Sequence, residues 1–265
     1  MGNTYILNTS DYTFSRFSDG GFSGKILLAV PKNANLPKLL IKSEKPTSAC
    51  NEFMYSRLAE LLGIIVPKTY IMNVAQNDAH LFSSPYVVGV EFMEGMHGFS
   101  LEEMRSSALW RKEYAEQYAL AAIFDQDDRV QLTMRADGHI TGYDFTEAFW
   151  IADLGKTSIQ LPGDLLTDIL AGRLKAMIQR GFSMLSAGAS VVKMHLELSE
   201  DAAIPADYIT PMRKFLTISD DQVLELTDVL YEAYPVSIVV FFEEYIKALK
   251  KKLGTYIHSL EKAAK

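Results

Sequence analysis

The feature that most constrains this chain is a hairpin signal with acidic residues at both of its outer ends. It lies within Ala121–Trp150, AAIFDQDDRVQLTMRADGHITGYDFTEAFW. Val130–Met134 and His139–Tyr143 have the pattern of two strands, and the Asp-Gly pair in Arg135–Gly138 predicts a tight turn between them. Because the outer ends of an antiparallel hairpin meet, we expect Asp144 to lie near the acidic residues that precede the first strand.

Those preceding residues include two carboxylates, Asp127 and Asp128. Acidic side chains that converge at strand ends, without a nearby lysine in the sequence, suit a bound Mg²⁺ and a phosphate. The plain alternative is a solvated acidic turn, since carboxylates are mostly exposed at turns. The hairpin alone does not decide between the two.

Composition sets the frame for this hairpin. The 265 residues are 48% hydrophobic and 22% charged, typical of a folded soluble chain with a sizeable core in one large domain or two lobes. A net charge of -7 argues against a nucleic-acid surface. The single cysteine, Cys50, excludes an internal disulfide and a multi-cysteine zinc site, and it fits a reducing, cytoplasmic setting. No signal-peptide pattern opens the sequence, and the apolar run Tyr118–Phe124 is too short to span a bilayer.

The N-terminal part of the chain has mainly strand patterns. The expected strands are Tyr12–Phe17, Lys25–Val30, Lys38–Lys42, Val66–Val74 and Pro85–Met93, with one helix at Glu52–Leu62. A glycine-rich loop with Gly20, Gly21, Ser23 and Gly24 follows the first strand. It could present backbone N–H groups to an anion, or it could be an ordinary turn. Lys42 ends an apolar strand, and most such lysines are solvated. Glu52, expected in the first helical turn, is a partner that could hold the Lys42 ammonium over a phosphate.

From Ser100 onward the pattern is mainly helical. The expected helices are Leu101–Ser106, Leu109–Phe124, Gly163–Leu170, Leu174–Leu185, Pro205–Phe215, Asp220–Ala233 and a long one that begins at Pro235. The last carries an apolar stripe of Ile238, Val239, Phe242, Ile246, Leu249, Leu253 and Ile257. We interpret this stripe as core, with an interfacial membrane helix as the alternative.

Four stretches resemble a known family: LLIK (Leu39–Lys42), NEFMYSRLAELLGIIVP (Asn51–Pro67), AAIFDQDDR (Ala121–Arg129) and YDFTEAF (Tyr143–Phe149). Together with the order of the elements, they resemble the HipA-like serine/threonine kinases, especially the short single-chain HipA-like proteins of bacteria. The resemblance covers roughly Tyr12–Trp150. It implies an α+β, two-lobed protein-kinase-like fold. Residues 1–95 would form an antiparallel-sheet, nucleotide-binding lobe with one helix, and residues 96–265 a mainly helical catalytic lobe.

The resemblance also implies roles for residues that would bind ATP. Lys42 would hold the α- and β-phosphates, with Glu52 orienting it, and the glycine loop would cover the phosphates. Glu91, Phe92 and Met93 would form the hinge that offers backbone groups to adenine.

A second set of implied roles concerns the transfer step. Asp128, or Asp127 if the register shifts by one, would accept the proton of the substrate hydroxyl, and Asp144 would bind Mg²⁺. The pattern departs from the family where a second metal ligand is expected, because no Asn follows Asn77. Gln131 and Thr133 occupy that region and could ligate metal through oxygen.

Three functions therefore remain open. The first is an ATP- and Mg²⁺-dependent kinase acting on Ser or Thr of a protein. The second is a pseudokinase that binds nucleotide or a protein partner, and the third is a small-molecule phosphotransferase, since the fold does not determine the acceptor. None of the three calls for a nucleic-acid or membrane partner.

Overall fold

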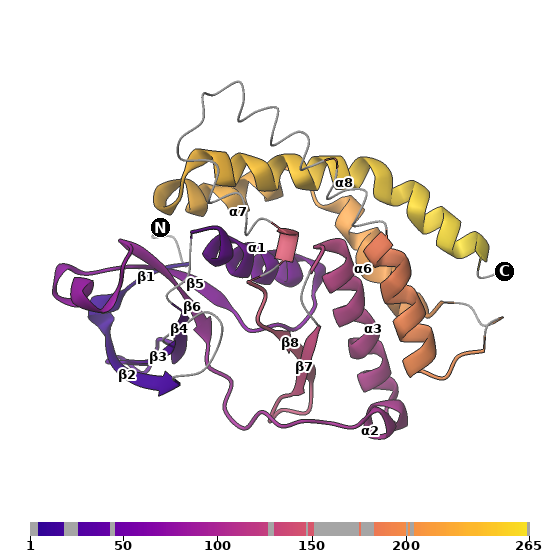
Figure 1. Cartoon of the computed structure of the whole chain (residues 1–265), viewed down its shortest axis with the longest axis horizontal. Coiled ribbons are helices and arrows are strands. Elements are labelled where there is room, and N and C mark those ends of the chain that lie inside the picture. Colours follow the sequence, from indigo (N-terminus) through magenta and orange to yellow (C-terminus); the bar gives the residue numbers. More distant parts are fainter. Residues whose placement is uncertain are drawn as a thin grey trace.

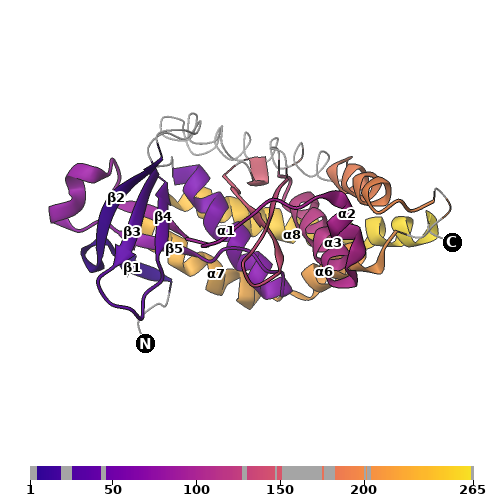
Figure 2. The same cartoon turned by 90° about the horizontal axis from the view of Figure 1, so that it is seen from below.

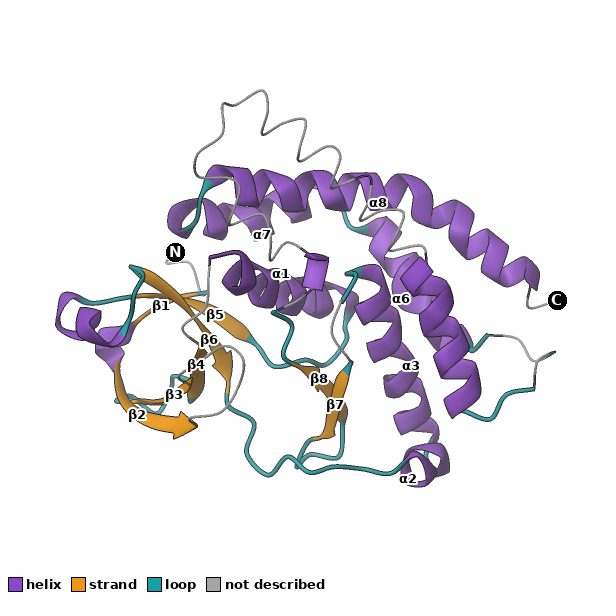
Figure 3. Ribbon diagram, in the orientation of Figure 1, coloured by secondary structure: helices purple, strands orange, loops and turns teal. Residues whose placement is uncertain are grey.

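The sheet and most of the helices occupy different parts of the molecule in this computed structural model (Figure 1). It describes residues 5–18, 26–42, 46–126, 130–146, 148–150, 175, 183–199, 201 and 204–263. The N-terminal strands curl at one end of the molecule, and helices dominate the other end (Figure 3). The expected α+β class, with a sheet part followed by a mainly helical part, is confirmed.

Six strands form one sheet in the order β1-β5-β6-β4-β3-β2. They are β1 Ile6–Asn8, β2 Tyr12–Ser18, β3 Ile26–Pro31, β4 Leu39–Lys42, β5 Thr69–Asn73 and β6 Tyr86–Glu91. The five strands from β2 onward match the expected ones, and each of their pairings is antiparallel. Strand β1 was not expected, because three residues are too few to show an alternating pattern. It pairs parallel with β5, with Ile6 opposite Ile71.

The two faces of this sheet pack against different partners. One face carries a small core of Tyr12, Leu27, Ala29, Leu39, Ile41, Met72 and Val87. On the other face, Ile71 and Val88 belong to the large core that includes the helices. Because side chains alternate along a strand, Leu39 and Ile41 of β4 enter the small core while Lys42 faces the side of the helices.

Helix α1, Pro46–Leu62, connects the two parts of the molecule (Figure 2). It begins six residues before Glu52, so the expectation that Glu52 lies in the first turn is wrong, and so is its dipole argument. Proline is favoured in the first turn of a helix, which explains the earlier start. The helix ends as expected at Gly63, whose φ is +73°. Paired bonds from Gly63 N to Glu60 O and from Ile64 N to Ala59 O close the last turn.

Much of α1 is buried around its circumference. Cys50, Phe53 and Leu58 are fully buried, and so is the polar Asn51. A helix that is covered on nearly all sides needs polar partners for its buried polar groups. The Thr146 carbonyl is the partner of Asn51, and Lys42 is the partner of Glu52.

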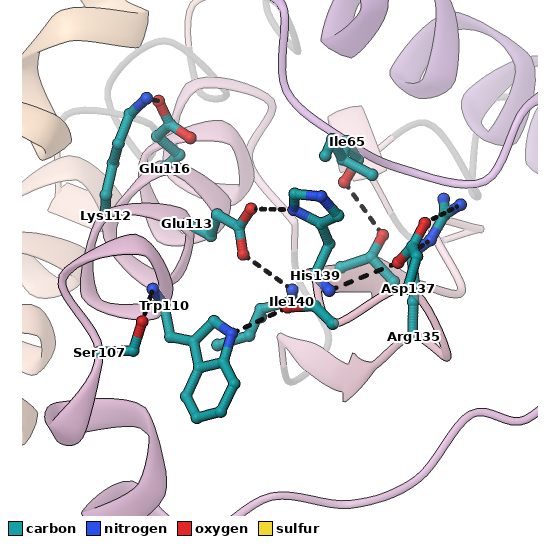
Figure 4. A network of polar contacts seen from close by, with 12 residues as sticks. Ile65, Ser107, Trp110, Lys112, Glu113, Glu116, Arg135, Asp137, His139 and Ile140 are labelled. Carbon is teal, nitrogen blue, oxygen red and sulfur yellow. Dashed lines mark hydrogen bonds and ion pairs between the residues drawn. The ribbon is translucent and has the colours of Figure 1, made fainter.

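The expected hairpin forms between strands β7, Gln131–Met134, and β8, Ile140–Tyr143, with Gln131 opposite Tyr143. Its turn contains Gly138 with a φ of +83°. Helices α2, Leu101–Ser106, and α3, Ala108–Ile123, precede it. The turn end is fastened to α3 by Glu113, which bonds to His139 Nδ1 at 2.5 Å and accepts from the amide of Ile140 at 2.9 Å (Figure 4).

The C-terminal helices build most of the large core. They are α6 Ala206–Thr217, α7 Asp220–Ala233 and α8 Val236–Ala263, and residues 183–195 are also helical. The expected helix Gly163–Leu170 and most of Leu174–Leu185 lie outside the described residues. The apolar stripe of α8 is buried throughout, from Ile238 to Ile257, so it is core rather than a membrane surface. Within the described part of the chain, no helix combines the length and apolar character needed to cross a bilayer.

Short 3-10 segments complete the described structure. They are η1 Thr9–Asp11, η2 Gln76–Leu81 and η3 Ala148–Trp150. The last follows β8 closely, and the amide of its Phe149 donates to the carbonyl of Phe124 at the end of α3. This bond brings the chain after the hairpin back to the chain before it.

Candidate active site

Lys42, at the end of β4, is the point where three distant segments meet. Its Nζ forms an ion pair with Glu52 Oε1 of α1. A second ion pair joins Nζ to Oδ1 of Asp144, 2.7 Å away, directly after β8. The lysine side chain is 13% exposed, so it is not a solvated strand-end lysine.

Glu52 is the most deeply buried member of this group, with a side chain that is 1% exposed. One of its carboxylate oxygens contacts Lys42. The other, Oε2, is buried and accepts no hydrogen bond from the residues that the structure describes. A buried carboxylate is costly unless it is paired with a charge, and the Lys42 ammonium provides that charge.

Asp144 sits in an unusual backbone conformation, with a φ of +64°. Non-glycine residues in this region cost energy and persist where neighbouring contacts hold them. Two such contacts come from Gln126, whose Nε2 donates to the Asp144 carbonyl at 3.1 Å, and from Thr146, whose Oγ1 donates to Asp144 Oδ1 at 3.2 Å. The Asp144 side chain is 40% exposed, so solvent and a ligand can reach its carboxylate.

The residues after Asp144 are attached to α1. Phe145 stacks on Tyr55 with ring centroids 3.8 Å apart and an interplanar angle of 7°. Asn51 donates from Nδ2 to the carbonyl of Thr146 at 2.7 Å. Burial raises the pKa of Tyr55 well above its usual range, and the charge of Glu52 raises it further, so the Tyr55 hydroxyl stays protonated. Helix α1 therefore supplies both the Lys42 partner and the support for the Asp144 segment.

The acidic turn after α3 is described only as far as Gln126. Asp125 is fully buried, with a φ of +47°. Asp127 and Asp128, the candidate bases, lie outside the described residues, so their distance from Asp144 is untested. The hydrogen bond from Gln126 to Asp144 nevertheless brings the residue before Asp127 to the Asp144 backbone.

The two candidates for a second metal ligand occupy different places along β7. Gln131 pairs with Tyr143, next to Asp144, at the site end of the hairpin. Thr133 pairs with Thr141, two positions nearer the turn, and its hydroxyl donates to the His97 carbonyl at 3.0 Å. By strand register, Gln131 therefore lies nearer to Asp144 along the hairpin than Thr133 does.

The expected hinge follows β6, where the chain leaves the sheet for the helical part. The amide of Glu91 donates to Lys68 O and that of Phe92 to Lys38 O, both at 2.8 Å. These two amides are thus already used within the protein. A cavity of about 220 Å³ lies here, lined by residues 91–94 and 135–137, and it includes Met93.

The glycine loop that should cover the phosphates lies outside the described residues. This applies to Gly20, Gly21, Ser23 and Gly24. Ser18 pairs with Ile26, and Ile26 in turn lies opposite Lys42, so the loop joins β2 to the strand next to β4.

The described side chains at this site fit a magnesium nucleotide in their chemistry. Mg²⁺ is usually bound by one or two carboxylates together with substrate phosphates and waters. Within the described residues, no group of three His, Cys, Asp or Glu could hold a metal alone. Asp144 offers one accessible carboxylate, and the buried Oε1 of Gln126 beside it has no hydrogen-bond partner among the described residues.

These features together define the class. A curled, mostly antiparallel sheet packs against one helix, and this helix carries the glutamate partner of a lysine at the end of a strand. A mainly helical part follows, with an aspartate after a hairpin. This is a protein-kinase-like fold.

One solved structure of this fold is that of CtkA, a proinflammatory kinase of Helicobacter pylori. The similarity spans 96% of this chain and 97% of that chain, with a TM-score of 0.62 and 9% sequence identity. No family model and no curated protein matches the chain. At this level of identity the similarity shows a shared fold, and activity remains to be argued from the site.

Sequence reasoning missed four contributors to the site: Asn51, Gln126, Thr146 and Tyr55. All four act through contacts with the Asp144 segment or with Phe145. The only signal in the sequence was position, since Asn51 directly precedes Glu52 and Gln126 directly precedes Asp127. Which neighbour each one contacts depends on side-chain geometry that no spacing rule provides.

Proposed function

We propose that this chain is an ATP- and Mg²⁺-dependent phosphotransferase of the HipA-like kinase type that phosphorylates Ser or Thr of a protein. The observation that carries the proposal is the convergence of Lys42, Glu52 and Asp144. An ammonium held between two carboxylates, one buried and one accessible, is the arrangement that phosphoryl transfer needs for phosphate and metal. The fold shared with a kinase supports the same class.

The residues divide the work as follows in this proposal. Lys42 binds the phosphates of ATP, and Glu52 orients its ammonium. The acceptor oxygen attacks the γ-phosphorus while the bond to the β–γ bridging oxygen breaks, and ADP leaves. Asp127 or Asp128 takes the hydroxyl proton. Mg²⁺, held by Asp144 with Gln131 as a further oxygen donor, would neutralise charge on the phosphates.

The remaining assignments concern nucleotide binding. We assign residues 1–95 to the nucleotide-binding lobe and residues 96–265 to the catalytic lobe. Gly20, Gly21, Ser23 and Gly24 cover the phosphates in this proposal, and the backbone around Met93 contacts adenine. The hinge amides that already bond to Lys38 and Lys68 direct this contact to carbonyl groups and to Met93.

A nucleotide-binding module without transfer activity is the second candidate. One observation favours it: the Thr133 hydroxyl bonds to His97, and no Asn follows Asn77 to supply the usual second metal ligand. Such a module would bind ATP with Mg²⁺ and would not transfer phosphate.

The decisive experiment measures ATP binding by calorimetry with and without Mg²⁺, together with radiolabelled phosphate transfer to a generic Ser/Thr protein and to the chain itself. We expect Mg²⁺-dependent binding, and transfer that falls by more than about a hundredfold in Asp144→Ala, because the lost metal interaction is worth several kcal/mol. Asp228→Ala is the control. Asp228 is exposed on α7 and belongs to none of the groups placed at the site, so transfer should be retained. Absence of ATP binding in the wild type would overturn the proposal.

The same assay distinguishes the two candidate bases. One of Asp127→Ala and Asp128→Ala should lose transfer as severely as Asp144→Ala, and the other should be mild, because one carboxylate of a neighbouring pair faces the acceptor. Both should keep ATP binding. Binding without transfer in the wild type would favour the nucleotide-binding module.

A further inference from the structure

Asn51 is a buried polar side chain that links helix α1 to the segment holding Asp144. It is fully buried and lies one residue before Glu52. Its Nδ2 donates to the Thr146 carbonyl at 2.7 Å, across 95 residues of sequence. A buried amide with a short, direct bond to a distant backbone group restricts the position of both segments.

This bond belongs to a chain of contacts that ends on the Asp144 carboxylate. The residue that Asn51 holds, Thr146, donates from its hydroxyl to Asp144 Oδ1 at 3.2 Å. Asp144 itself has a φ of +64°, a conformation that persists only where neighbours over-determine it. Asn51 fixes the backbone two residues after that strained position.

The same helix carries the lysine partner. Glu52 binds Lys42, and Lys42 binds the same Oδ1 of Asp144 at 2.7 Å. Adjacent residues of α1 thus reach Asp144 by two routes, one through Lys42 and one through Thr146. Because the second route begins beside Glu52, a displacement of α1 would move the ammonium and the Asp144 backbone together.

We infer that Asn51 is a positioning residue for Asp144, and that it couples the placement of α1 to metal binding. This inference rests on the proposed function and deepens it. Loss of the Asn51 donor leaves the Thr146 carbonyl unpaired and frees the Asp144 carboxylate to reorient. Metal affinity then falls, while nucleotide binding in the absence of metal does not change.

The test uses Asn51→Leu, which keeps the shape of the side chain and removes the donor, and Asn51→Ser as a milder variant. Ser56→Ala is the matched control. Ser56 lies on the same helix, is buried, and donates to the carbonyl of Pro67 at 2.9 Å, away from Asp144. Both positions lose one side-chain bond to a carbonyl, so both should lower Tm. Only the Asn51 variants should alter metal binding.

The measurement is the Mg²⁺ concentration at half-maximal tightening of ATP binding by calorimetry, repeated with Mn²⁺ binding followed by electron paramagnetic resonance. We expect it to rise about threefold to tenfold in Asn51→Leu, in line with the loss of one hydrogen bond, and to stay at the wild-type value in Ser56→Ala. ATP affinity without metal should be the same in all variants.

Two results would overturn this inference, and they differ from each other. Wild-type metal dependence in a folded Asn51→Leu or Asn51→Ser protein with a lowered Tm would make Asn51 a packing residue only, with the proposed function intact. A wild-type protein that shows no Mg²⁺-dependent ATP binding would remove the proposed function and this inference together.

Discussion

A buried glutamate is linked to each end of the β7–β8 hairpin, directly at the turn and through Lys42 at Asp144, and the two glutamates differ in how completely their oxygens are hydrogen-bonded. At the turn end, both oxygens of Glu113 are used, one by His139 and one by the Ile140 amide. Trp110 Nε1 donates to Gly138 O at 2.8 Å in the same network (Figure 4). Hydrogen bonds with side chains of α3 therefore fasten this end of the hairpin to the helix.

The Asp144 end differs, because several of its buried polar atoms are not hydrogen-bonded to the described residues. Glu52 Oε2, Gln126 Oε1 and Asn51 Oδ1 are buried there and accept no hydrogen bond from the residues that the structure describes. Buried polar atoms are usually paired, so these acceptors distinguish the Asp144 end from the turn end. The comparison shows that one end of the hairpin is fully bonded to α3, whereas the other end carries the site that we propose.

The largest difference in stability between the two ends is expected on substitution of Lys42. Lys42→Met removes the cation beside a carboxylate that is 1% exposed, and should lower the free energy of unfolding by about 3–5 kcal/mol while abolishing transfer. Chemical denaturation measures this change in the free energy of unfolding. Arg135→Met, the control at the turn end, breaks a more exposed ion pair with Asp137 and should cost about 0–1 kcal/mol.

The double variant Lys42→Met/Glu52→Leu tests whether the unpaired Glu52 carboxylate causes the loss of stability. It removes the stranded charge as well, so most of the lost stability should return while transfer remains absent. Equal stability of Lys42→Met and the wild type would show that this pair is not a buried ion pair in solution.

A smaller effect is expected at the turn end. Glu113→Ala leaves the buried Ile140 amide without its acceptor, and should lower the free energy of unfolding by about 1–3 kcal/mol. Calorimetry should find the Mg²⁺ dependence of ATP binding unchanged, because Asp144 lies at the other end of the hairpin. A loss of affinity comparable with the loss of stability would mean that the two ends are not independent.

The smallest effect is a dependence on pH at Asp137. Its slight burial acts to raise the pKa, but the hydrogen bond and charge of Arg135, together with His139, outweigh this and hold the pKa of Asp137 below its usual value. A carboxyl with a lowered pKa in the folded state adds stability above its unfolded pKa, and this stability is lost as the pH falls through the folded pKa.

The wild type should therefore lose slightly more stability than Asp137→Asn as the pH falls through the lowered pKa of the Asp137 carboxyl. Denaturation at a series of pH values measures the difference. Identical pH profiles for the two proteins would show that Arg135 and His139 do not stabilise the Asp137 carboxylate.

Much of the fold was predictable where one local signal dominates. The presence of the hairpin followed from Asp137-Gly138. Helix α7 was expected with the bounds observed, since Ser219 and Gln222 form a capping box. The start of α1 was not predictable. Thr47 and Asn51 are buried polar residues in that helix, so they interrupt the apolar periodicity that locates a helix in sequence.

The site was predictable as a set of segments and not as a set of contacts. The hairpin argument and the family resemblance together placed Lys42, Glu52 and Asp144 in one site, and these side chains do meet. Their roles remain proposals. The bonds made by Asn51 and Gln126 depend on rotamers chosen by packing between α1, α3 and the Asp144 segment, which single-sequence patterns do not encode.

Because Cys50 is buried within α1, the reactivity of its thiol reports how often this helix opens. This thiol, the only one in the chain, is fully covered next to Asn51, and burial raises its pKa well above the usual value. Thiol reagents attack the thiolate, so alkylation has to wait for a transient opening of the helix. The labelling rate of the unmodified protein therefore follows how often α1 leaves its position, and a ligand that bridges Lys42 and Asp144 should slow it.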